Sequence, residues 1–252
     1  MRLLIVITLL LLEHQYFACD LSFYGNYNRA PKIYIENDKP KGILIEMMAY
    51  VAKDVNCNFT YNLSPWNRAY RSALNSEGGI IGFSKTKDRV KIFDYSDVMY
   101  DDNIMMISTV KGKFKYSTIK DLANKRIITN SGAKYGEEFA QAEKDGLFTL
   151  IEHTGDSSAW IKFVLLGRAD VALISPNLSS LLKTIKEDDY LRENQDLLYI
   201  FPEPFRVDPN YLGFSKKLGM TEFLKKFNAS VKKGIATGEF EKIIQKYDPH
   251  KQ

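Results

Sequence analysis

Short apolar runs that alternate with amphipathic stretches constrain the fold of this chain more than any other feature. Strand-like runs at 21–24, 59–63 and 80–83 are separated by helix-like stretches that begin near Gly42 and at Pro65. The first of these stretches carries apolar residues at spacings of three and four, as one buried helix face requires, and proline is well tolerated at a first helical position. The N-terminal third therefore predicts a βαβαβ order, which means a parallel sheet covered by helices.

A second series of the same kind follows. Its strand-like runs lie at 103–108, 126–130, 149–152, 170–174, 198–201 and 211–214, its helical stretches at 135–142, 157–166 and 178–185, and two amphipathic helices end the chain. Two α/β units of roughly a hundred residues each fit the usual domain size. Ligands of such sheets bind at the carboxyl ends of the strands, and a cleft between two lobes is a preferred pocket.

Charge and motif content narrow the classes of function. The 35 basic and 31 acidic residues give a net charge of +4, with both signs interspersed. A nucleic-acid binder gathers its basic residues on one stripe, so we expect no nucleic-acid partner. The chain shows no nucleophile–base pair, no metal-ligand spacing and no glycine-rich phosphate loop, so we expect no metal, no cofactor and no catalytic residue.

The N-terminus reads as an export signal. Arg2 is followed by an apolar run from Leu3 to Leu12, and the small residue Ala18 stands at a plausible cleavage site. This arrangement predicts a secretory signal peptide over residues 1–18 and a periplasmic location. The apolar run is about half as long as a membrane crossing, and the alternative interpretation is a buried N-terminal helix.

Two cysteines allow two interpretations. Cleavage after Ala18 would make Cys19 the first residue, where lipoproteins carry their lipid, although Tyr16 stands where such signals usually have an aliphatic residue. An oxidising compartment also permits a disulfide with Cys57. Both cysteines precede strand-like runs that can be neighbours in a right-handed βαβ unit. The sequence favours the disulfide, and lipid attachment stays the alternative.

One motif resembles a known family. Residues 82–89 read GFSKTKDR and are followed by FDYSD at 93–97 and by Tyr100. This resembles the G-x-T-x-T-x-E-R…D-F-S-x-P-Y signature of the bacterial extracellular solute-binding proteins of family 3, the periplasmic receptors of polar-amino-acid ABC transporters.

Further segments match this family in the same order. They are Lys41-Gly42-Ile43 with Glu46, the P-W-x-R segment at 65–69, an S-G-T-like loop at 130–133, G-R-A-D at 167–170 and the terminal helix at 238–247. The resemblance implies an α/β, two-lobed periplasmic-binding-protein fold of type II. Each lobe would be a mostly parallel sheet flanked by helices, and the chain would cross the hinge twice. Lobe I would comprise 19–102 plus 209–252, and lobe II 103–208.

The resemblance also implies a ligand site. It makes Arg89 the residue that clamps a ligand carboxylate, for which a planar guanidinium offers two parallel hydrogen bonds. The alternative is a surface arginine paired with Asp88 or Asp94. Ser84 and Thr86 stand at the two motif threonines, where they would assist the same carboxylate or only cap the loop.

Other positions complete the implied site. Trp66 and Tyr24 follow first-lobe strands and would stack on the ligand, or would pack in the core. Ser131, Gly132 and Ala133 precede a helix, whose first amides attract an anion, or form an ordinary turn.

Two positions depart from the family pattern. Ser175 and Asn26 stand where amino-acid binders of the family tend to have carboxylates. Because a buried ammonium without a counter-charge is unfavourable, this predicts weak binding of common α-amino acids, unless Glu203 or Asp208 supplies the charge. Lys85 and Lys134 stand near the expected cleft and would suit a second anionic group.

The resemblance implies a monomeric receptor that captures a small polar or anionic solute, an amino acid or a related carboxylate, and delivers it to an ABC permease. One alternative is an enzyme on the same scaffold, a dehydratase acting on a cyclic carboxylic acid, with Glu203, Asp156 or His153 as acid or base. A second alternative is a soluble ligand-sensing partner of a membrane receptor.

Overall fold

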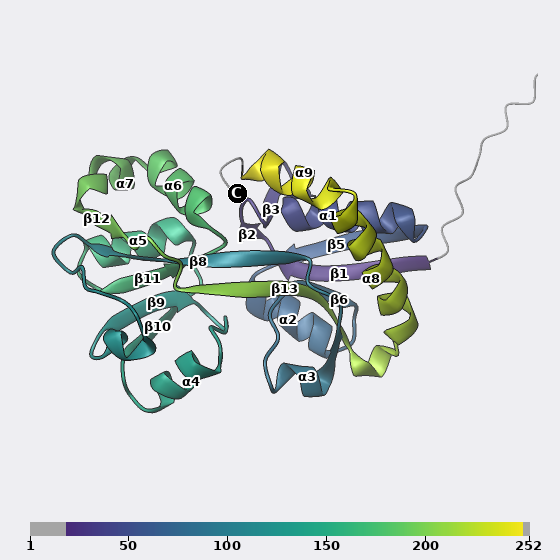
Figure 1. Ribbon diagram of the computed structural model, residues 1–252, viewed down its shortest axis with the longest axis horizontal. Coiled ribbons are helices and arrows are strands. Elements are labelled where there is room, and N and C mark those ends of the chain that lie inside the picture. Colours follow the sequence, from purple (N-terminus) through teal and green to yellow (C-terminus); the bar gives the residue numbers. More distant parts are fainter. Residues whose placement is uncertain (1–18, 249–252) are drawn as a thin grey trace, which may run out of the picture.

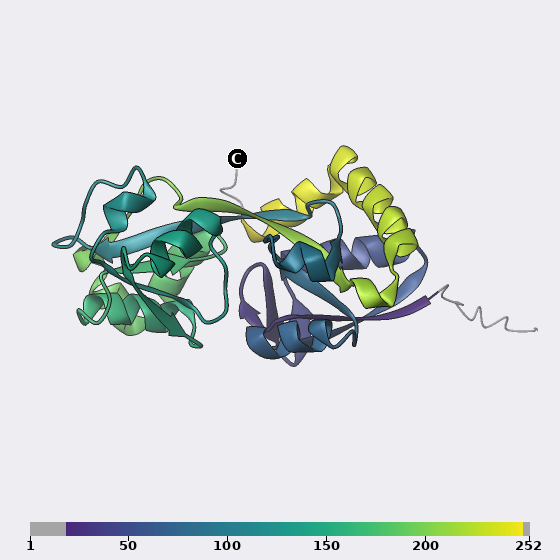
Figure 2. The ribbon, with the colours of Figure 1, turned by 90° about the horizontal axis from the view of Figure 1, so that it is seen from below.

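Two α/β lobes joined by a pair of long strands make up the protein (Figures 1 and 2). The computed structural model describes residues 19–248, so the predicted signal peptide at 1–18 lies outside the described residues. Within residues 19–248, no helix combines the length and apolar character needed to cross a bilayer.

Lobe I is built from the N-terminal elements and the last helices. They are β1 (Cys19–Asn26), β2 (Asn28–Arg29), β3 (Ile33–Glu36), β4 (Lys39–Lys41), α1 (Ile43–Asp54), β5 (Cys57–Ser64), α2 (Trp66–Leu74), β6 (Gly79–Phe83), α3 (Arg89–Ile92), β7 (Phe93–Tyr95), the 3₁₀ helix η3 (Lys216–Leu218), α8 (Thr221–Ala236) and α9 (Glu239–Tyr247). Strand β1 lies between β5 and β6 and is parallel to both, as the βαβαβ order predicts. The small antiparallel sheet β2-β3-β4 was not predicted.

Lobe II is built from the central part of the chain. Its elements are η1 (Ile119–Leu122), β9 (Arg126–Asn130), α4 (Glu137–Lys144), β10 (Thr149–His153), α5 (Ser157–Leu165), β11 (Val171–Ile174), α6 (Leu178–Glu187), α7 (Asp189–Glu193), η2 (Gln195–Leu197) and β12 (Leu198–Ile200). Strand β9 is parallel to both β10 and β11. Buried apolar clusters line the two faces of this sheet, one under α5 and α6 and one under α4.

The two hinge strands are β8 (Tyr100–Thr109) and β13 (Arg206–Ser215). They pair antiparallel through their N-terminal halves, with Asp102 opposite Asp208. Beyond that segment β8 pairs with β11 and β12 of lobe II, and β13 pairs with β6 and β7 of lobe I. The chain therefore passes between the lobes twice. The lobe boundaries predicted at 102/103 and 208/209 fall inside the paired segment, and we keep them as proposed limits.

Close packing at Gly42 holds the small sheet of lobe I against α1. Gly42 has a φ of 117°, and a Cβ there would lie 2.5 Å from the backbone oxygen of Lys32. That oxygen accepts a 3.0 Å hydrogen bond from the amide of Leu44 in the first turn of α1. Only glycine allows this approach without strain. The contact fixes the backbone at Lys32, which lies next to the cavity between the lobes.

A disulfide joins the edge of the lobe I sheet. Cys19 and Cys57 are directly opposite each other in the parallel β1–β5 pair, and their sulfur atoms are bonded, with Cα atoms 4.7 Å apart. The sulfur of Cys19 is therefore engaged within the protein in this structure.

A second connection between the lobes, which we call the C-terminal tie, consists of Asp248, Asn177 and Ser179. Asp248 follows α9, and its carboxylate accepts hydrogen bonds of 2.7 Å from Asn177 Nδ2 and 2.5 Å from Ser179 Oγ. Asn177 is the N-cap of α6 in lobe II, where its Oδ1 accepts from the amide of Ser180. Asp248 and Asn177 are both almost fully buried.

Removing the C-terminal tie is expected to destabilise the protein. Asp248→Ala leaves the Asn177 and Ser179 donors without this acceptor, which should lower the free energy of unfolding by about 1–3 kcal/mol. Urea unfolding of the purified protein measures this. Asp196→Ala, which removes an exposed carboxylate, is the control, and an equal effect of the two substitutions would contradict the structural role of the tie.

Candidate functional site

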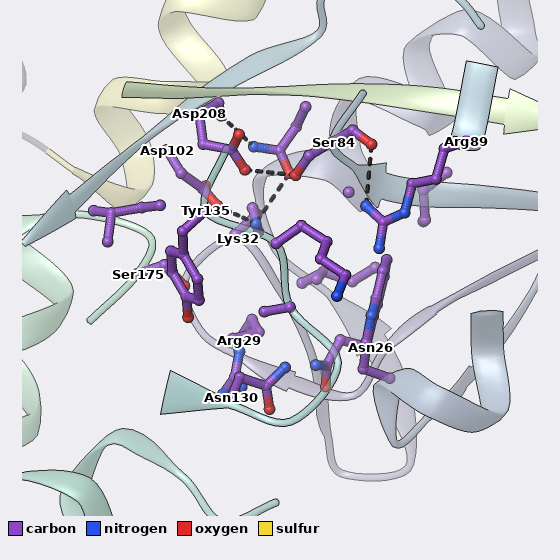
Figure 3. A pocket seen from close by; sticks show the side chains of 18 residues that line it. Asn26, Arg29, Lys32, Ser84, Arg89, Asp102, Asn130, Tyr135, Ser175 and Asp208 are labelled. Carbon is purple, nitrogen blue, oxygen red and sulfur yellow. Dashed lines mark hydrogen bonds and ion pairs between the residues drawn. The ribbon is translucent and has the colours of Figure 1, made fainter. Parts of the chain in front are cut away.

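A cavity lies between the lobes, beside the paired segment of the hinge strands (Figure 3). The space within its outline is about 630 Å³, which includes open solvent at its mouth. Its lining consists of Asn26, Arg29, Lys32, Ile33, Trp66, Ile81, Gly82, Ser84, Arg89, Asp102, Ile104, Asn130, Ala133, Lys134, Tyr135, Ser175, Asp208 and Asn210.

Arg89, at the start of α3, reaches this cavity from lobe I. Its side chain is buried, Nη1 donates a 3.1 Å hydrogen bond to the backbone oxygen of Ser84, and its guanidinium carbon lies 4.6 Å from the centre of the Phe83 ring. Burial lowers the pKa of Arg89, but an arginine stays charged in proteins. Among the described residues, no carboxylate lies within ion-pair distance of it.

The alternative role of Arg89, as the partner of a neighbouring aspartate, is wrong. Asp88 pairs with Lys91 at 2.9 Å and Asp94 pairs with Lys216 at 2.7 Å. The guanidinium therefore lies at the wall of the cavity without an ion-pair partner among the described residues.

Ser84 connects Arg89 to a buried carboxylate. Its backbone oxygen accepts from Arg89, and its Oγ forms a 2.5 Å hydrogen bond with Oδ2 of Asp208 (Figure 3). Burial raises the pKa of Asp208, and the neighbouring Asp102 raises it further. The guanidinium of Arg89 and the carboxylate of Asp208 thus both contact Ser84.

Lys32 and Asp102 form a second polar group near the hinge. Lys32 forms an ion pair with Asp102 and donates a 3.1 Å hydrogen bond to Asn210 Oδ1. The other carboxylate oxygen of Asp102 is buried and has no hydrogen-bond partner among the described residues. Asp102 and Asp208 come from the paired segment of β8 and β13, so the hinge itself provides the negative charges of the cavity.

Several residues predicted from the sequence line this cavity, namely Arg89, Ser84, Trp66, Asn26, Ala133 and Ser175. Asn26 and Ser175 place no carboxylate there, as the sequence indicates. The inference drawn from them, that an ammonium would lack a counter-charge, needs correction because Asp208 lines the same cavity. Asp208 was the alternative source of charge, whereas Glu203 lies on an exposed loop and is not in the lining.

Four predicted residues lie outside the lining. Thr86 Oγ1 accepts from the backbone amide of Arg89 at 3.2 Å, which is the capping role. Tyr24 lies next to Glu77 instead, and burial raises the pKa of its hydroxyl. Ser131 is 3.5 Å from Asn67 Nδ2, and the amide of Gly132 donates to Glu152 Oε1 at 2.7 Å. Because the Gly132 amide already has an acceptor, and α4 begins only at Glu137, this loop offers less to an anion than predicted.

Arg29 was missed by the sequence analysis. It lies on β2 of lobe I, 7% exposed, with its guanidinium carbon 4.8 Å from the centre of the Trp160 ring in lobe II. Its Nη1 donates a long 3.4 Å hydrogen bond to the backbone oxygen of Asn28, and its Nη2 has no partner among the described residues. The only sequence signal was its place just after the first strand, where ligand-binding loops occur.

The two lysines named from the sequence behave differently. Lys134 lines the cavity from the loop after β9. Lys85 lies over the rings of Tyr95 and Tyr211, 5.2 and 4.1 Å from their centres, and is not in the lining.

The acid–base residues of the enzyme alternative also lie elsewhere. His153 Nδ1 accepts from the amide of Gly155 at 2.9 Å, and Asp156 caps α5 by accepting from the amide of Ala159 at 2.9 Å. Neither they nor Glu203 line the cavity.

Known proteins resemble the chain over nearly its full length. The sequence model of the bacterial extracellular solute-binding proteins, family 3, matches residues 22–250. The arginine-binding extracellular protein ArtP of Bacillus subtilis (strain 168) is 24% identical over 221 residues, which cover 86% of this chain and 81% of ArtP.

Solved structures share the fold. An ancestral arginine-binding protein bound to arginine matches with a TM-score of 0.72 and 20% identity, covering 93% of this chain and 99% of that one. A histidine kinase sensor domain with similarity to periplasmic binding proteins matches with a TM-score of 0.74 and 16% identity, covering 90% and 95%.

Proposed function

The chain belongs to the bacterial extracellular solute-binding proteins, family 3, and on that premise we propose that it captures a small carboxylate-bearing solute between its lobes and delivers it to an ABC-type permease. The solute is an amino acid or a related acid. The protein acts as a monomer in the periplasm, binds without a cofactor and catalyses no reaction. It closes around its ligand by bending at β8 and β13.

The buried guanidinium of Arg89 is the observation that carries this proposal. It faces the cavity, is held by the Ser84 carbonyl and has no carboxylate partner among the residues described. A ligand carboxylate would supply that partner through two charge-assisted hydrogen bonds.

Asp208 extends the proposal to the amino group. Ser84 contacts both Arg89 and Asp208, and both line the same cavity. We therefore propose that Arg89 binds the carboxylate of an amino acid and Asp208 its ammonium. The amino acids bound by the relatives named above make this class the first to test.

A ligand screen tests the proposal. Protein freed of co-purified solutes by unfolding and refolding is screened by thermal shift against the twenty amino acids and a set of organic acids, and positive results are measured by calorimetry. We expect at least one carboxylate-bearing solute to bind, and its methyl ester to bind much more weakly. Equal binding of the ester, or no binding by any acid, would contradict the proposal.

Asp208→Asn tests the ammonium contact. The amide keeps an oxygen for Ser84 but loses the charge, so the affinity for the best amino acid should fall roughly tenfold or more, the scale of a charged hydrogen bond. The deaminated analogue of that amino acid lacks the ammonium and is the control, because its affinity should not fall. Equal losses for both ligands would show that Asp208 acts only on structure.

The same contact gives a pH dependence. Burial raises the pKa of Asp208 above its ordinary value of 3.8. Only the ionised carboxylate attracts an ammonium, so the affinity for the amino acid should decline as the pH falls through this raised pKa. The decline should be smaller in Asp208→Asn, where only the carboxylates of the ligand still titrate.

A further inference from the structure

The lining of the cavity carries more positive than negative charge. Arg29, Lys32, Arg89 and Lys134 face two carboxylates, those of Asp102 and Asp208. Lys32 is paired with Asp102. Asp208 contacts Ser84 and forms a 3.7 Å ion pair with Arg206. The lining therefore offers at most this one carboxylate to the three cations Arg29, Arg89 and Lys134.

Arg29 is a buried cation whose guanidinium lacks hydrogen-bond acceptors. Its Nη2 is buried without a hydrogen-bond partner among the described residues, and its one hydrogen bond, to its neighbour Asn28, is long at 3.4 Å. The aromatic face of Trp160 stabilises the guanidinium in part. The nearest opposite charges act only at a distance, because Asp102 is held by Lys32 and Asp156 caps α5. A buried donor left unpaired is unfavourable, so the site is incomplete as it stands.

Position distinguishes Arg29 from Arg89. Figure 3 shows the two side chains on different sides of the cavity. Arg89 belongs to the lobe I wall, whereas the guanidinium of Arg29 rests on Trp160 of lobe II, and Lys134 comes from the lobe II loop after β9.

From this arrangement we propose that the solute is acidic, with a second anionic group that binds Arg29 and Lys134 while its first carboxylate binds Arg89. This rests on the function proposed above and narrows its ligand class to dicarboxylates, such as acidic amino acids and related diacids. The solute differs in charge from arginine, the ligand named for ArtP. A second cationic group would add to the excess positive charge of the lining instead of neutralising it.

Matched pairs of an acid and its amide test the proposal. Calorimetry compares L-glutamate with L-glutamine, L-aspartate with L-asparagine, glutarate with glutaramate and succinate with succinamate, and includes L-arginine. Each pair has nearly the same shape and differs by one negative charge. The tightest ligand should be a diacid that binds at least about tenfold more tightly than its amide, as one lost charge-assisted hydrogen bond predicts.

The outcomes separate the two proposals. If an amide or L-arginine binds as tightly as the best diacid, the acidic ligand class is wrong, but a carboxylate receptor remains. If none of these compounds or the acids of the wider screen binds, both proposals fail.

Substitutions of Arg29 test whether it determines the preference for the diacid over its amide. Arg29→Gln should reduce the preference for the diacid over its amide about tenfold, and Arg29→Lys should restore part of it. A purely structural role on Trp160 would weaken both ligands equally and leave their ratio unchanged, which would overturn the assignment. Arg71→Gln, on the exposed side of α2, should change neither affinity.

A substitution of Lys134 tests the same subsite without disturbing the folding of the protein. Its side chain is exposed, so Lys134→Gln should fold normally even if Arg29→Gln does not. It should also lower the diacid-to-amide ratio. An unchanged ratio in Lys134→Gln would remove Lys134 from the proposed subsite.

Discussion

Replacing Arg89 by lysine should weaken binding of the tightest carboxylate ligand by about 1.5–3 kcal/mol, the scale of a hydrogen bond to a charged group. This corresponds to roughly 10- to 150-fold in the dissociation constant. Lysine keeps the charge but offers a single ammonium, which cannot form two parallel hydrogen bonds to a carboxylate. It also loses the planar contact with Phe83 and the fixed hydrogen bond to the Ser84 carbonyl.

Calorimetry at constant pH and salt measures the effect, with Arg71→Lys as the matched exposed control. The folded fraction of each variant is checked by its thermal transition, because Arg89 is buried. An unchanged affinity in a folded Arg89→Lys protein would remove Arg89 from the ligand site.

Loss of the disulfide should have a comparably large effect, but on stability. The bond joins residues 38 positions apart, and constraining a loop of this length in the unfolded chain stabilises the folded state by about 2–5 kcal/mol. The double substitution Cys19→Ser and Cys57→Ser should lower the free energy of urea unfolding by that amount. Ligand affinity should stay the same, because neither cysteine lines the cavity.

Reduction provides the control for this prediction. Dithiothreitol should lower the urea concentration at the unfolding midpoint of the wild-type protein. It should not change the midpoint of the double variant. Intact mass after alkylation reports the thiols of the exported protein. Two free thiols, or a lipid on Cys19, would show that the bond does not form there.

The regular elements could be predicted because their sequence periodicity reflects one buried face. The strand predicted at 126–130 is β9 with the same bounds, and the helix at 157–166 is α5 within one residue. The hinge could be predicted only in part. The run at 103–108 lies within β8, but only 211–214 was predicted of β13, which has ten residues from Arg206. Its first half carries Asp208 and Asn210, which face the cavity and so break the apolar pattern.

The residues of the candidate site also fall into two groups, those that a local sequence pattern identifies and those that only the fold brings together. Arg89 and Ser84 belong to a contiguous motif and were recognisable. Lys32, Asp102 and Asn210 come together from positions 70 and 178 residues apart in sequence, so no local pattern connects them. Arg29 has an even weaker signal, because its role depends on Trp160 in the other lobe. Charged residues that the fold brings together at the hinge can be identified only from the structure.

The C-terminal tie limits how the lobes can rotate. Two adjacent strands form a flexible strap, which by itself permits both bending and twisting. Asp248 attaches the end of α9 to Asn177 and Ser179, and Asn177 also donates to the hydroxyl of Tyr100 on β8. The tie therefore lies beside the strap, where its buried hydrogen bonds oppose twisting of one lobe against the other. While the tie holds, we therefore expect the lobes to open and close more readily than they twist. A membrane protein that docks across both lobes would then meet two surfaces whose relative orientation depends mainly on how far the cleft is open.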